Sequence, residues 1–268
     1  MVPHSRPELP APLRTWLEAL VASNPPRCAG TLLELLLGTM LSDRGLLSRA
    51  LLAIVPRRCW QAYYWMVERG KLRWLPLVHA LCALLRREFP VARRFVILDD
   101  TLVPRSSDQA PGAAVRFDHA HKTNRPDHLL CQCLVTLSAV LTGHGRERSV
   151  PLITSLVPET GNPSKLHLAK VLLRAIGNRL GPLTLLVDAW YMKRPLVLWA
   201  VQRGIVVIGQ ARRDTALFAL PPVPAVPRRG HPRVYGARLD AAACAALPRT
   251  EKRLACYGGA PVRWRSTV

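Results

Sequence analysis

Two apolar segments of the sequence run directly into aspartates. FVILDDT (residues 95–101) ends on Asp99 and Asp100, and TLLVDAWY (residues 184–191) reaches Asp188. Both segments have the composition of buried strands, and open α/β sheets place ligands beyond the carboxyl ends of their strands. We therefore expect Asp100 and Asp188 to meet at one edge of one sheet.

A pair of carboxylates at such an edge could hold a metal ion. Two carboxylates brought together repel each other and resist ionising unless a cation lies between them. Mg2+ (or Mn2+) is the expected ion, because Mg2+ binds through one or two carboxylates plus phosphate oxygens, and two such ions can hold both sides of a phosphoryl displacement. Aspartates also end strands simply as turn formers, so spacing alone leaves both interpretations open.

The elements that would position these acids begin near residue 90. Apolar and β-branched segments predict strands, and a segment with helical periodicity at residues 164–181 predicts a helix. A second helix, at residues 192–204, lies between two strands, and this order pairs those strands in parallel. The fold class is therefore α/β, with strands expected at residues 94–100, 128–141, 149–157, 183–188 and 205–210.

The pattern before residue 90 is helical, with helices expected at residues 12–22, 31–41 and 46–55. Thr31, followed three positions later by Glu34, predicts a capping box at the start of the second helix. The short link at residues 42–45 is typical of a helix-turn-helix. Such a pair of helices either reads DNA or serves only as packing partners, and the sequence leaves both open.

The charge balance indicates a polyanionic partner. The 268 residues include 38 Lys and Arg against 17 Asp and Glu, a formal net charge of +21. Nucleic acid and an anionic membrane surface are the partners that such an excess favours. Apolar stretches such as residues 77–85 are about half the ~20 residues of a spanning helix, and the N-terminus has no signal-peptide pattern. The expected location is therefore the cytoplasm, in association with the nucleoid.

One segment, residues 57–74, interleaves cations with aromatic rings. Cations for phosphates and flat rings for bases make a nucleic-acid surface, but aromatics on an amphipathic helix also form core, and both interpretations stand. The candidate DNA contacts come from this segment, from a polar meander and from later basic loops: Arg57, Arg58, Lys71, Arg73, Lys122, Arg212, Arg213, Arg228 and Arg229.

The runs ILDDT and VDAWY, with the segments at residues 209–218 and 228–239, resemble insertion-sequence transposases of the DDE superfamily endonucleases. The resemblance implies a ribonuclease H-like core, two divalent metal ions, and cutting and joining of DNA at element ends. The aspartate directly before the threonine of DDT, Asp100, corresponds to the first catalytic and metal-binding acid of the family. Asp188 corresponds to the second, and Asp99 is a neighbour on the other side of the strand.

The third acid of the family, a glutamate in a Tyr-x2-Arg-x3-Glu-x6-Lys helix, has no counterpart in this sequence. Tyr235 and Arg238 fit the spacing, but Ala242 takes the place of the glutamate, and the surroundings of Glu251 do not match. The resemblance thus implies a C-terminally truncated transposase that is inactive or impaired as it stands. The alternative is a non-catalytic DNA-binding remnant, or a regulator of an intact transposase.

These patterns together divide the chain into three parts. Residues 1–90 are expected to form a helical, DNA-binding region, and residues 91–220 a ribonuclease H-like mixed sheet that is flanked by helices and carries two of three acids. Residues 221–268 are expected to be the start of a basic, proline-rich insertion, so the fold would be incomplete at the C-terminus. DNA is the expected partner, with a second copy of the chain or an intact transposase as a further one.

Overall fold

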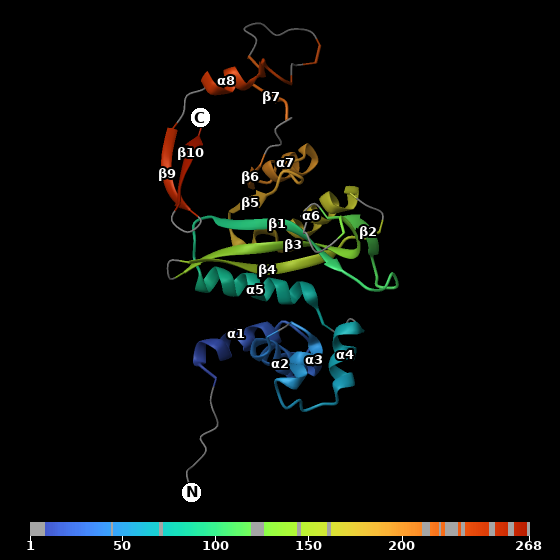
Figure 1. Ribbon diagram of the computed structural model, residues 1–268. Helices are drawn as coiled ribbons and strands as arrows, with labels where there is room; N and C mark the ends of the chain where they lie inside the picture. Colours follow the sequence, from blue (N-terminus) through green and yellow to red (C-terminus); the bar gives the residue numbers. More distant parts are fainter. Residues whose placement is uncertain are drawn as a thin grey trace. The chain divides into compact units, whose positions relative to one another are not determined.

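The computed structural model describes residues 9–268 except 44, 70–71, 119–125, 144–145, 160–161, 211–214, 220, 223–229, 232–233, 247–249, 257–259 and 267–268. The chain forms two compact units, Met1–Gln210 and Ala211–Val268. The first unit contains a group of helices followed by a mixed sheet with helices packed on it (Figure 1). This arrangement confirms the α/β fold class and is consistent with a ribonuclease H-like core.

In the part of the chain that the structure describes, five helices precede the sheet: α1 (Ala11–Ala22), α2 (Pro26–Leu41), α3 (Leu47–Leu52), α4 (Trp60–Glu68) and α5 (Trp74–Glu88). The predicted capping box is wrong, because α2 begins at Pro26 and Thr31 is buried within it. Proline suits a first helical position, where its missing N–H would have had no intrahelical partner. Glu34 instead accepts hydrogen bonds from the Tyr63 hydroxyl and the Arg57 backbone amide.

Among the described residues, the sheet of the first unit contains six strands: β1 (Arg94–Pro104), β2 (Ala113–Phe117), β3 (His128–Gly143), β4 (Arg146–Leu156), β5 (Leu183–Val187) and β6 (Val206–Gly209). Their order is β2-β3-β1-β5-β6, with β4 also paired to β3. β5 pairs in parallel with both β1 and β6, whereas β3 is antiparallel to its neighbours. The predicted parallel pair at residues 183–210 is confirmed, with α7 (Arg194–Val201) as the connection.

One face of the sheet carries the core. Inward residues of β1, β3 and β5 pack with α5, with α7 and with α6 (Asn162–Ile176), which continues into a short 3-10 helix (Gly177–Leu180). Side chains alternate between the faces of a strand, and along β1 Val96 and Leu98 are fully buried while Phe95 is 46% exposed. The two faces of β1 therefore have different surroundings up to the point where the acids begin.

The second unit has short elements of its own. β7 (Leu217–Phe218) and β8 (Arg238–Leu239) form one antiparallel pair, followed by α8 (Ala241–Ala246). β9 (Thr250–Cys256) and β10 (Ala260–Ser266) form another antiparallel pair. Among the described residues, no helix combines the length and the apolar character that crossing a membrane requires.

Gly38 allows α2 to approach α3 closely, and it gives a test of the helical group. A Cβ added at Gly38 would lie 2.3 Å from the backbone oxygen of Ala50, so the helices would have to move apart. We expect Gly38→Ala to lower the free energy of unfolding by about 1–3 kcal/mol, measured by urea denaturation.

Gly30→Ala on the same helix is the matched control. Of the atoms that the structure describes, none outside the local helix lies within 4 Å of a Cβ added at Gly30. Alanine is favoured over glycine within a helix by up to about 1 kcal/mol, so this variant should be as stable as the wild type or more so. Equal destabilisation by the two substitutions would contradict the close approach of α2 and α3.

Candidate metal centre at the joined ends of two strands

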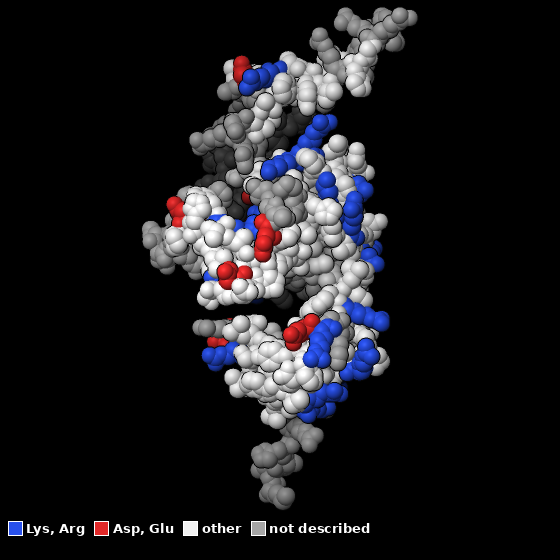
Figure 2. Space-filling view, turned by 90° about the vertical axis from the view of Figure 1, so that its right-hand side faces the viewer, with Lys and Arg blue, Asp and Glu red and all other residues white. Residues whose placement is uncertain are grey.

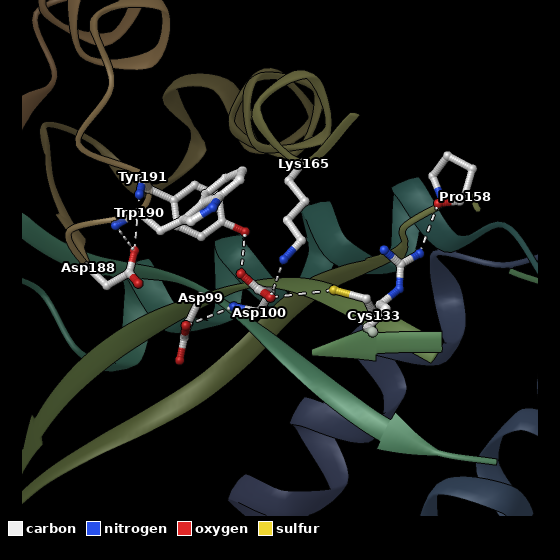
Figure 3. Close-up of polar contacts among 9 residues, drawn as sticks. Asp99, Asp100, Cys133, Pro158, Lys165, Asp188, Trp190 and Tyr191 are labelled. Carbon is white, nitrogen blue, oxygen red and sulfur yellow. Dashed lines mark hydrogen bonds and ion pairs between the residues drawn. The ribbon is translucent and has the colours of Figure 1, made fainter. Parts of the chain in front are cut away.

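The parallel pairing of β1 with β5 brings the acid-bearing segments together. The register runs from Arg94 opposite Leu183 to Leu98 opposite Val187, so the acids of both strands follow directly after the last pair. The expectation that the two strands adjoin is confirmed by this register. Three carboxylates, those of Asp99, Asp100 and Asp188, are thereby gathered at one edge of the sheet (Figure 3).

Asp188 forms the turn that follows β5. Its Oδ1 accepts hydrogen bonds from the backbone amides of Trp190 and Tyr191, both at 3.1 Å. Turn formation was one of the two interpretations of this aspartate, and it does not exclude the other. Among the described residues, no hydrogen-bond donor reaches the second carboxylate oxygen of Asp188, which leaves that oxygen available to a ligand.

Asp100 lies in a polar network on the helix-covered side of β1. Its Oδ2 accepts a hydrogen bond from Lys165 Nζ at 2.8 Å and one from Cys133 Sγ at 3.4 Å, while its Oδ1 accepts one from the Tyr191 hydroxyl at 3.1 Å. The Lys165 and Asp100 side chains are only 13% and 19% exposed. A largely buried carboxylate requires such a counter-charge, because burying it unpaired is costly.

The network changes the proton affinity of its neutral members. Burial, followed by the negative charge of Asp100, raises the pKa of Tyr191 well above its ordinary value of 10.0. Burial and the same carboxylate raise the pKa of the Cys133 thiol to about 11. Both groups therefore stay protonated near neutral pH and act as hydrogen-bond donors to Asp100.

Asp99 points away from this network (Figure 3). One of its oxygens accepts the backbone amide of Asp100 at 2.8 Å. Neighbouring groups crowd its carboxylate, and this desolvation raises its pKa, helped by the charges of Asp100 and Asp188. Carboxylates that repel one another favour a cation between them.

The sequence reasoning missed Lys165 and its surroundings. Lys165 stands one helical turn before Ala169 on the buried stripe of α6, which continues through Leu172 and Ile176. A lysine on an apolar helical stripe is the signal that could have identified it. Its Nζ also lies 5.0 Å from the centroid of the Trp190 ring.

The aspartates after β5 and within β1 suit a hard divalent cation, provided that waters or phosphate oxygens complete its coordination. Mg2+ takes oxygen ligands, usually one or two carboxylates together with waters and phosphate oxygens. The described part of the chain has no group of three or more His, Cys, Asp and Glu side chains placed to hold a metal by themselves. Glu251, the only glutamate after Asp188, lies in β9. The catalytic and metal-binding roles assigned to Asp100 and Asp188 stay predictions.

Only some of the candidate DNA contacts can be placed. Arg57, Arg58 and Arg73 are exposed, and Arg57 pairs with Glu34 at 3.4 Å. In the view of Figure 2, Lys and Arg side chains follow one side of the molecule, over the N-terminal helices and the sheet region. Six candidates lie outside the described residues: Lys71, Lys122, Arg212, Arg213, Arg228 and Arg229.

In the aromatic segment at residues 57–74, some rings belong to the core and others lie on the surface. Tyr63 is fully buried, whereas Trp60, Tyr64, Trp65 and Trp74 are exposed. The Arg69 guanidinium lies 4.5 Å from the centroid of the Trp65 ring. One side of α4 is therefore core, and the other presents rings and cations to solvent.

Comparisons with known proteins identify a family and one similar solved structure. A family model described as DDE superfamily endonuclease matches residues 29–268. Among solved structures, piggyBac transposase in a synaptic complex with hairpin DNA is similar, at 14% identity and a TM-score of 0.31. The similarity covers 75% of this chain and 41% of that chain. No curated protein matches the chain.

The hydrogen bond from Tyr191 to Asp100 gives a test of the network. Tyr191→Phe removes only the hydroxyl and leaves a largely buried carboxylate oxygen without that donor. We expect the free energy of unfolding to fall by about 1–2 kcal/mol in urea denaturation. Tyr64→Phe, at a side chain that is 39% exposed, is the control and should change stability by less than about 0.5 kcal/mol. Equal stability of the two variants would contradict the bond.

Proposed function

The chain belongs to the DDE superfamily endonucleases, and we propose that it is a DNA transposase that cuts and joins DNA at the ends of an insertion sequence. The observation that carries this proposal is the group of aspartates where β5 ends beside the middle of β1. Ligands of open α/β sheets bind beyond the carboxyl ends of the strands, and carboxylates there suit a metal-dependent phosphoryl transfer.

Endonucleases of this superfamily generally use divalent metals, and we propose Mg2+ or Mn2+ as the ion for this chain. Asp188 and one carboxylate of the Asp99–Asp100 pair would hold it, together with waters or phosphate oxygens. Such an ion supplies stabilisation of the charge that develops on phosphate oxygens and makes a bound water more acidic.

The remaining residues would prepare the acids for this task. The amides of Trp190 and Tyr191 fix the orientation of the Asp188 carboxylate through two hydrogen bonds. Lys193 Nζ lies 3.9 Å from the centroid of the Trp190 ring, in the turn that follows Asp188. Its ammonium would attract a DNA phosphate towards the carboxylates.

DNA binding is assigned to the basic residues. The net charge of +21 favours a polyanion, and the exposed rings and arginines around α4 suit phosphates and bases together. In this proposal residues 1–90 bind DNA, residues 91–220 form the catalytic core and residues 221–268 belong to a basic insertion. The six candidates outside the described residues remain part of the assignment.

A non-catalytic DNA-binding protein, or a regulator of an intact transposase, is the alternative. Both functions would place the chain at the nucleoid, and both allow a partner that is a second copy of the chain or an intact transposase. Both also require DNA binding, so that property cannot separate them. Metal-dependent cleavage can.

Cleavage of supercoiled plasmid is the test of the enzyme proposal. We expect slow nicking that requires Mg2+ or Mn2+. Asp188→Asn should reduce the nicking rate by about 10²- to 10³-fold. Asparagine keeps the Oδ1 acceptor that the turn needs, so this variant should fold and bind DNA as the wild type does. A chain that binds DNA but cleaves none with either ion would support the non-catalytic alternative.

The salt dependence of DNA binding tests the basic surface. Each phosphate contact contributes about −0.9 to the slope of log affinity against log salt concentration, so Arg58→Ala should make that slope shallower by about 0.9. Arg87→Ala is the control, because the Arg87 guanidinium is already paired with Glu88 at 2.7 Å. Fluorescence anisotropy with a short DNA duplex measures the slope for each variant. An unchanged slope for Arg58→Ala would show that this residue does not contact a phosphate.

A further inference from the structure

We infer that the two adjacent acids of β1 have different tasks: Asp99 faces the metal together with Asp188, whereas Asp100 is a positioning residue that acts through Lys165 and Tyr191. The inference rests on the proposed function, and it gives Asp100 a different role from the one that the resemblance implies. It is carried by the strand register, by the hydrogen bonds of each carboxylate and by the position of the Lys165 ammonium.

The register puts Asp99, rather than Asp100, level with Asp188. Leu98 is opposite Val187 in the last pair of β1 and β5, so Asp99 is the next residue of β1 and Asp188 is the first residue after β5. Successive residues of a strand project to opposite faces. Asp100 thus continues the helix-covered face of Leu98, and Asp99 lies on the other face.

The hydrogen bonds differ in the same way. Both oxygens of Asp100 already accept hydrogen bonds, from Tyr191 on one side and from Lys165 and Cys133 on the other. Asp99 and Asp188 each use one oxygen to accept backbone amides. No donor among the described residues reaches the second oxygen of either. The oxygens that are free to bind a cation therefore belong to Asp99 and Asp188.

The Lys165 ammonium makes Asp100 a poor metal ligand. Its Nζ is 2.8 Å from Asp100 Oδ2, so a divalent cation on that carboxylate would lie next to a positive charge. Like charges at such separations repel strongly where water is scarce. The Asp100 carboxylate instead neutralises the lysine and leaves the metal to its neighbours.

Asp100 would position the metal ligands through the turn after β5. Its Oδ1 accepts the Tyr191 hydroxyl, and the Tyr191 amide donates to Asp188. One residue, Tyr191, thus joins the carboxylate on β1 to the carboxylate after β5. Figure 3 shows Tyr191 between Asp188 and Asp100, with the Lys165 side chain reaching the same Asp100 carboxylate from α6.

The test compares pairs of substitutions that leave the net charge unchanged. Affinity for Mn2+ is measured on the full chain by the electron paramagnetic resonance signal of the free ion, with circular dichroism as the check of folding. Asp100→Asn is expected to weaken Mn2+ binding by about tenfold or more, because the Lys165 ammonium is left without its partner. Adding Lys165→Met removes that ammonium. The Mn2+ affinity of the double variant should then lie within about threefold of the wild-type affinity, a difference of under 1 kcal/mol.

The matched control is Asp99→Asn combined with Lys165→Met, which has the same formal charge as the other double variant. We expect it, and Asp99→Asn alone, to bind Mn2+ at least about tenfold more weakly than the wild type, without rescue. Rescue of the Asp99 pair, or failure to rescue a folded Asp100 pair, would overturn the inference. Wild-type affinity in Asp188→Asn would refute the metal centre of the proposed function itself, and the inference with it.

Discussion

The parallel pairing of β1 with β5 is the constraint on which the rest of the site depends. These strands are far apart in the sequence, and only their register brings Asp99 and Asp188 to the same level. The pairing also determines where the helices can lie, since α7 connects β5 to β6 and α6 leads into β5 over the same core. A slip of one residue would exchange the faces of β1 and move Val96 and Leu98 out of the core, so burial of these side chains keeps the acids in place.

Charge balance is the second requirement, and the chain meets it locally. A formal excess of 21 positive charges does not by itself stabilise a cluster of carboxylates, because most exposed charges are screened within about 10 Å. Lys165 is close enough to act without such screening, since its side chain is 13% exposed and its Nζ contacts Asp100. The result is a site whose inner acid, Asp100, is paired with a cation of the protein itself.

The strands and helices around the acids could be predicted from the sequence, because their signals are local. The strand that carries DDT, the strand before Asp188 and the helix between β5 and β6 all follow from apolar periodicity. The expected end of the first strand at Asp100 is wrong, because β1 continues to Pro104 through its pairing with β3. β2 could not be identified, because it is only five residues long and is held by its pairing with β3. The start of α2 was missed because Pro26 was not read as a helical position. The contacts of Asp100 with Lys165 and Tyr191 join residues 65 and 91 positions apart, and no local pattern reports such contacts.

The adjacency of the two aspartates has a physical consequence of its own. Two successive residues of a regular strand project to opposite faces, so a DD sequence cannot direct both carboxylates at one ion while the strand stays regular. β1 stays paired with β3 through both acids, from Val96 to Pro104, without a bulge. One carboxylate must therefore enter the helix-covered side, where it needs a cation and hydrogen-bond donors of its own. A lysine on the buried stripe of α6 and a tyrosine after β5 meet that need, and in doing so they tie α6 and the Asp188 turn to the strand that carries the other acid.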